Sequence, residues 1–156
     1  MFTAINLKKM FSSILIVELI GAVSIIIAST AMSMYRDLIL PDFAAPLVFI
    51  IVTWGILFAF LGVAFYFVQS SSNESKSRAA SRFWLQLFFI CVWPILFFNL
   101  RAFGVSAIWM LFSIAFSGIA AKNFFRVNRA AGWLIIPHIL FCIYLLYLNY
   151  GIFMLS

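Results

Sequence analysis

Few residues of this chain could do chemistry, because polar side chains are scarce within its long apolar runs. Glu18 is the acid among them, and a carboxyl group inside a membrane helix is costly enough to suggest a function. It could exchange protons or cations in a small multidrug transporter. It could equally be a shallow carboxyl group, neutral and hydrogen-bonded, since it lies only ten residues after Lys8.

His138 is the only histidine of the sequence. An imidazole can ligate haem iron or relay a proton, and it can also simply hydrogen-bond a neighbouring helix. No second histidine or acidic cluster lies near it in the sequence, so a metal site built from protein ligands is not expected. Cys91 and Cys142 lie in apolar runs without C-x-x-C spacing, and we expect both to pack as small apolar side chains.

Gln86, Trp93 and Phe97 form the third candidate group. Offsets of 7 and 11 residues place all three on one face of a helix. An amide, an indole and a phenyl ring on one stripe could line a ligand pocket, or they could pack against neighbouring helices. Pro94 follows Trp93 directly and is expected to kink or loosen the helix there.

Composition indicates the elements that must position these side chains. The chain has 156 residues, of which 67% are hydrophobic and 9% charged. A soluble domain of this size could not cover so much apolar surface, so the bilayer must act as solvent. The sequence contains no phosphate-binding loop, nucleophile elbow or metalloprotease helix, and no basic aromatic surface for nucleic acid.

Five apolar segments approach or exceed the roughly 20 residues that a helix needs to cross the hydrocarbon core. Continuous apolar runs favour helices over the alternating strands of a barrel. We therefore expect an all-α membrane protein, a bundle of five transmembrane helices in a single domain over residues 1–156. The expected spans are approximately Phe11–Met34, Leu47–Gln69, Phe83–Leu100, Phe103–Ala121 and Gly132–Leu155, separated by polar loops at Ser70–Ser81 and Lys122–Arg129 and a short turn at Asn99–Arg101.

The charged residues predict the orientation in the membrane. At one end of the expected bundle, Glu74 stands against eight cations, and at the other end two cations are balanced by two acids. The excess of positive charge predicts a cytoplasmic N-terminus in a bacterial-type inner membrane, with the C-terminus and the segment Tyr35–Pro46 outside. The cations of the first end are Lys8, Lys9, Lys76, Arg78, Arg82, Lys122, Arg126 and Arg129.

A stripe of small residues marks the fourth segment. Ser113, Ser117 and Ala121 follow one another at helical spacing, with Gly118 beside them. Small side chains let helices approach closely, so this stripe predicts a packing seam. The seam could lie within one molecule or between two copies. Trp109 could be an interfacial anchor or a pocket wall.

Residues between Tyr35 and Asn149 follow the pattern of one known family. The matching positions are Tyr35, Leu38, Pro41, Phe43, Pro46, Trp54, Leu57, Phe58, Gln86, Leu87, Trp93, Phe97, Phe98, Ala131, Gly132, Pro137, Leu148 and Asn149. In these residues the chain resembles the TspO/MBR family, which includes tryptophan-rich sensory proteins of bacteria and the mitochondrial translocator protein, or peripheral benzodiazepine receptor.

The resemblance implies five transmembrane helices with a ligand pocket among them, covered by a lid-like loop between the first two. Family members bind porphyrins, haem-like tetrapyrroles, sterols and isoquinoline-type compounds, and homodimers are common. No obligatory cofactor is implied, although porphyrin or haem could be bound as a ligand. The implied ligand-binding residues are Tyr35, Pro41, Phe43, Pro46, Trp54, Phe58, Gln86, Trp93, Phe97, Pro137, His138 and Phe141.

The chain departs from the family pattern at five positions, which are Met34, Ala45, Ile90, His138 and Phe141. Phe141 replaces a tryptophan that, with the one at position 54, is linked to light-dependent porphyrin degradation in relatives. The resemblance therefore does not carry that enzymatic activity over to this chain. The C-terminal sterol motif is also incomplete, because no lysine or arginine follows Leu148-Asn149-Tyr150.

The leading hypothesis is a membrane receptor or carrier for tetrapyrrole-like or sterol-like ligands, with a sensory, regulatory or transport role. One alternative is a small proton-coupled multidrug-type transporter that uses Glu18. Another is a non-catalytic partner that stabilises a second membrane protein.

Overall fold

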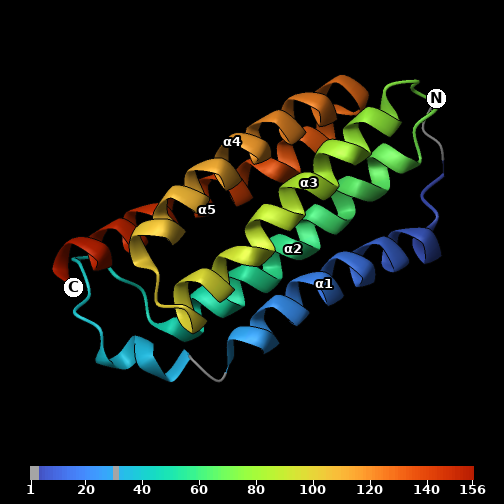
Figure 1. Ribbon diagram of the computed structural model, residues 1–156. Helices are drawn as coiled ribbons and strands as arrows, with labels where there is room; N and C mark the ends of the chain where they lie inside the picture. The colour runs from blue at the N-terminus through green and yellow to red at the C-terminus, as the bar shows by residue number, and fades with distance from the viewer. Residues whose placement is uncertain (1–3, 30–31) are drawn as a thin grey trace.

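The computed structural model describes residues 4–29 and 32–156, and five long helices dominate them (Figure 1). Each of the five is long and apolar enough to cross a membrane. A short 3-10 helix, η1, follows the first helix, and a π-helical turn, η2, follows the third. The elements in chain order are α1 (Leu7–Ser29), η1 (Met32–Asp37), α2 (Leu47–Gln69), α3 (Lys76–Pro94), η2 (Ile95–Asn99), α4 (Phe103–Val127) and α5 (Arg129–Leu155).

The helices pack as an antiparallel bundle. α1 packs on α2, α2 on α5, α5 on α4, and α4 on α3, while α1 and α3 touch less extensively. η1 and the segment before α2 lie at the end of the bundle that holds the C-terminus (Figure 1). Exposed leucine, isoleucine, valine and phenylalanine side chains cover all five long helices, as expected for surfaces that contact lipid.

Two glycines allow α1 and α2 to approach closely. A Cβ atom on Gly62 would lie 2.5 Å from the Cα of Ile14, and one on Gly21 would lie 2.4 Å from the ring of Phe58. The hydroxyl of Ser13 donates a hydrogen bond of 2.8 Å to the Gly62 carbonyl across the same seam. Close backbone contact of this kind is the usual basis of helix association in lipid, where apolar burial provides no drive.

The second span, Leu47–Gln69, is confirmed at both ends, but boundaries of the other four spans differ from those expected, and α1 begins at Leu7 rather than Phe11. The first span does not reach Met34, because α1 ends at Ser29 and Met34 belongs to η1; residues 30 and 31 lie outside the described part. The third helix begins at Lys76 rather than Phe83. A polar sequence in water can still extend a helix when it contains good helix formers such as lysine, arginine and alanine.

The predicted loop at Lys122–Arg129 was also wrong. α4 continues to Val127 and α5 begins at Arg129, so only Asn128 separates them. Its side-chain Oδ1 accepts a hydrogen bond of 3.1 Å from the backbone N–H of Ala131 and caps α5. An asparagine cap satisfies a free backbone donor, which makes so short a turn possible.

The two prolines inside helices act differently. After Pro94 the backbone widens into η2, which confirms the expected loosening. α5, in contrast, runs through Pro137 to Leu155 without ending. Neighbouring helices can compensate the hydrogen bond that a proline removes inside a membrane helix.

The small-residue stripe of α4 lies within the bundle. Ser113, Ser117 and Ala121 are buried against neighbouring elements, whereas Gly118 is exposed. Trp109 is a seam residue too, because its indole N–H donates a hydrogen bond of 2.7 Å to the carbonyl of Phe89 on α3. The stripe is therefore a seam of one molecule, with Gly118 on its outer side.

Substituting Gly62→Ala is predicted to destabilise the bundle by about 1–3 kcal/mol, because the new methyl group would collide with the backbone of Ile14. Gly55→Ala is the matched control on the same helix, since a Cβ there meets nothing within 4 Å. Thermal unfolding of the purified protein in detergent measures both. Equal melting temperatures for the two variants would contradict the close seam.

Candidate functional site

A column of buried aromatic rings occupies the middle of the bundle. Trp54 of α2 stacks on Phe58 at 5.2 Å between ring centroids and faces Trp93 of α3 at 6.3 Å. Trp93 in turn stacks on Phe97 at 5.1 Å. All four side chains are buried. The structure thus brings together four of the sequence-predicted residues, from two helices and the π-turn.

Two polar side chains face this aromatic column. Gln86 and His138 are both buried, and their Nε2 and Nδ1 atoms lie 3.5 Å apart, a long contact for a hydrogen bond. The imidazole meets the ring of Phe58 edge-on at 6.3 Å between centroids. Gln86 and Trp93 of α3 and Phe97 of η2 are thus all buried, and His138 of α5 contacts Gln86.

Polar atoms of this region lack partners. Among the described residues, the indole N–H of Trp54 and the Oε1 atom of Gln86 are buried and form no hydrogen bond. Leaving a buried donor or acceptor unpaired costs about 1–3 kcal/mol each. Unpaired groups of this kind are uncommon in native structures and call for an explanation, such as a bound ligand.

Asn149 is a buried core residue that was not among the predicted ligand-binding residues. Its Oδ1 atom accepts a hydrogen bond of 2.9 Å from the indole N–H of Trp93, and its Nδ2 atom donates one of 2.8 Å to the Phe103 carbonyl. The family pattern had pointed to this position, but its role was not apparent. A lone amide inside an apolar run was the available signal, as it was for Gln86.

His138 does not lie in a ready-made metal centre. The described residues contain no group of three or more histidine, cysteine or acidic side chains that could hold a metal ion. The closest sulfur is that of Cys142, 3.8 Å from both ring nitrogens.

The segment Leu38–Pro46, here called the lid, is fastened to α5 near the C-terminus. The Tyr144 hydroxyl donates to the Phe43 carbonyl at 3.2 Å and accepts from the Ala45 N–H at 2.7 Å. The Tyr147 hydroxyl donates to the Asp42 carbonyl at 2.5 Å. Pro41 packs so closely on Gly151 that a Cβ there would lie 2.7 Å from the proline ring.

Tyr35 of η1 holds the lid from the other side. Its hydroxyl donates a hydrogen bond of 2.8 Å to the Ala45 carbonyl. Burial, and secondarily the nearby Tyr144, raises the pKa of Tyr35 from 10.0 to about 12. The folded state therefore holds the phenolic proton of Tyr35 more tightly than the unfolded state does. The resulting contribution to folding stability is complete below pH 10 and is lost as the pH rises through about 12.

Not all predicted residues reach the aromatic column. Phe43 has a positive φ of 63° and a side chain that is 92% exposed, so it points away from the bundle. Pro46 is exposed before the first turn of α2, and Pro137 is half-buried. Phe141 is buried and stacks with Tyr144 at 6.3 Å, beside the hydrogen bonds that fasten the lid.

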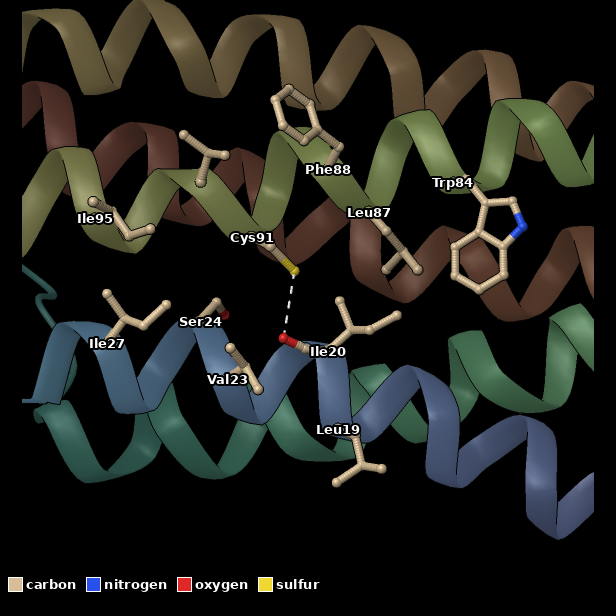
Figure 2. Close-up of a pocket in the computed structure, with 11 residues that line it drawn as sticks. Leu19, Ile20, Val23, Ser24, Ile27, Trp84, Leu87, Phe88, Cys91 and Ile95 are labelled. Carbon is tan, nitrogen blue, oxygen red and sulfur yellow. Dashed lines mark hydrogen bonds between the residues drawn. The ribbon is translucent and has the colours of Figure 1, made fainter.

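A groove on the outside of the bundle holds none of the predicted residues. It lies between α1 and α3, has a volume of about 530 Å³ and is almost entirely apolar (Figure 2). The thiol of Cys91 points across it toward the Ile20 carbonyl at 4.0 Å. Glu18, which is partly exposed on α1, lines neither this groove nor the aromatic column.

The sequence was compared with known protein families and with curated proteins. Residues 13–155 match the model of the TspO/MBR family. The match covers the chain from α1 to the end of α5, including the aromatic column and the lid. No curated protein matches the chain.

Replacing Tyr144→Phe is predicted to loosen the lid, because one hydroxyl makes two of its backbone hydrogen bonds. Amide hydrogen exchange over residues 38–46 should become at least several-fold faster, as expected for losing roughly 1–2 kcal/mol of hydrogen bonding. Tyr150→Phe is the matched control, since Tyr150 is exposed on the same helix. Identical exchange in both variants would show that Tyr144 does not fasten the lid.

Proposed function

Because the chain belongs to the TspO/MBR family, we propose that this integral, multi-pass membrane protein is a receptor or carrier for flat, largely apolar ligands. Tetrapyrroles such as porphyrin or haem are the preferred class, and sterol-like molecules are the second. The single observation that carries the proposal is the pair of unpaired polar atoms, on Trp54 and Gln86, beside buried stacked rings.

The chemistry of the column suits such a ligand. A tetrapyrrole presents a wide aromatic face, for which indole and phenyl rings supply stacking partners, and nitrogen atoms that can be paired by a few polar groups. Trp54 offers a free donor and Gln86 a free acceptor. His138 lies next to Gln86, and among the described residues its ring nitrogens have the Gln86 amide and the Cys142 thiol as hydrogen-bond partners.

The acidic edge of a tetrapyrrole has a candidate partner at the lid. Arg36 is exposed in η1, directly after the lid-holding Tyr35. A guanidinium group pairs well with a carboxylate, so Arg36 is proposed to meet a propionate at the outer mouth. The ligand would then lie under the lid, with its rings toward Trp54 and its acids toward water.

Binding requires a change of shape, since side chains fill the column. Ligand rings must displace or intercalate between the stacked residues, and the lid must open to admit them. The lid is held by a few hydrogen bonds from tyrosine hydroxyls to its backbone, which can break without unfolding a helix. We therefore propose that the lid is the entry gate.

Protoporphyrin titration tests the site. Trp54→Phe and Gln86→Leu each remove an unpaired polar atom. Gln86→Leu keeps the side-chain volume and should leave thermal stability unchanged or raise it, whereas Trp54→Phe also leaves a cavity and should lower it. The same changes should weaken protoporphyrin binding by roughly tenfold, because a ligand hydrogen bond is lost. Opposite effects of Gln86→Leu on stability and on affinity are the signature of a group kept for a ligand.

Two comparisons sharpen this test. Trp84→Phe alters the outer groove and should not change protoporphyrin affinity. Unchanged binding in both Trp54→Ala and Trp93→Ala would refute the site. Glu18→Gln should also leave protoporphyrin affinity unchanged. Proton release driven by substrate is a separate measurement, and its loss in Glu18→Gln would show that the protein is a proton-coupled transporter.

We propose that α1 begins at the cytoplasmic face, because eight cations gather at that end against Glu74 alone. A membrane-impermeant maleimide should therefore label the Ser72→Cys variant only after the cells are permeabilised, so that the reagent reaches the cytoplasmic face. Labelling of intact cells would reverse the orientation. A homodimer, which the family resemblance implies, stays a prediction.

A further inference from the structure

A second hollow lies on the outside of the bundle, between the last turns of α4 and the first turns of α5. Its volume is about 550 Å³, and we call it the α4–α5 groove. Its floor is open at Gly118, where an added Cβ would meet no atom within 4 Å. The lining residues are Gly118, Ala121, Lys122, Phe125, Arg126, Ile136 and Ile139.

The groove has a charged mouth. Lys122 and Arg126 stand one helical turn apart on α4, and both side chains are exposed. The end of the bundle at which they lie carries a single carboxylate, Glu74, among eight cations. Asn73, next to Glu74, donates a hydrogen bond of 3.4 Å from its side-chain amide to the Arg126 carbonyl. The loop between α2 and α3 therefore lies beside the mouth, and Glu74 is its one acidic residue.

Below the mouth, the groove is apolar. Gly118 lies four residues from Lys122, or about 6 Å along the helix axis, toward the bilayer centre. On α5, Ile136 and Ile139 form the opposite wall at that depth. Trp133, 62% exposed, meets the ring of Phe125 edge-on at 5.5 Å, and an exposed tryptophan is typical of the membrane–water interface.

We propose that the α4–α5 groove binds an anionic phospholipid. Its phosphate lies between Lys122 and Arg126, and one acyl chain runs over Gly118 toward Ile139. Charge complementarity selects the headgroup, since juxtamembrane cations attract anionic lipid. The continuous apolar floor selects a lipid over a soluble phosphate, which would leave the groove unfilled. This inference does not rest on the proposed ligand of the aromatic column.

Native mass spectrometry of the full-length protein, released from micelles that contain palmitoyl-oleoyl phosphatidylglycerol or the matching phosphatidylcholine, tests the proposal. The wild-type protein should retain phosphatidylglycerol preferentially. The double variant Lys122→Gln/Arg126→Gln should lose that preference, with roughly tenfold weaker phosphatidylglycerol binding. Gly118→Leu should weaken binding of both lipids, because its side chain fills the floor, and its melting temperature should match wild type.

Lys8→Gln/Lys9→Gln is the matched control, because it removes the same charge from the same end but not from the groove. If it weakens phosphatidylglycerol binding as much as the groove variant does, the attraction is diffuse and the site is refuted. Two other results would overturn the lipid assignment in favour of a simple anion site. One is that the wild-type protein retains soluble glycerol phosphate as well as it retains phosphatidylglycerol, and the other is that Gly118→Leu binds phosphatidylglycerol as tightly as wild type does.

Discussion

The side-chain amide of Asn149 makes the interaction on which the core of this bundle depends. It accepts a hydrogen bond from the indole of Trp93 and donates one to the Phe103 carbonyl, so a single residue of α5 connects α3 to the start of α4. Asn149 is fully buried, and breaking either bond would leave a buried polar group unpaired. The orientation of the Trp93 ring, and hence the whole aromatic column, follows from this constraint.

The π-helical turn η2, which precedes α4, is also held by hydrogen bonds within the protein. After Pro94, the carbonyl groups of Ile95 and Leu96 in the π-turn accept hydrogen bonds of 3.1 Å each from the N–H groups of Leu100 and Ala102. The amide of Asn99 reaches the carbonyl of Ile27 at the end of α1, at 3.2 Å. The loosened helix end is thus stabilised because the carbonyl groups of Ile95 and Leu96 find partners within the protein.

α5 connects the core to the lid. Phe141, Tyr144, Tyr147 and Gly151 follow His138 along the helix, and each contacts either the lid or the residue that holds it. A side chain that moves at the column can therefore shift the same helix that fastens the lid. The same helix therefore carries His138 of the candidate site and the residues that fasten the lid.

The sequence by itself determined the all-helical membrane class, the number of spans and the resemblance to the family, because apolar length and helical spacing are local properties. Gln86, Trp93 and Phe97 were placed on one face from their offsets alone, and the structure buries all three. Only the tertiary structure decided that Phe43 points outward, that Asn149 joins three elements and that one asparagine separates α4 from α5. Those outcomes depend on contacts between residues far apart in the chain, and no periodicity within one segment encodes them.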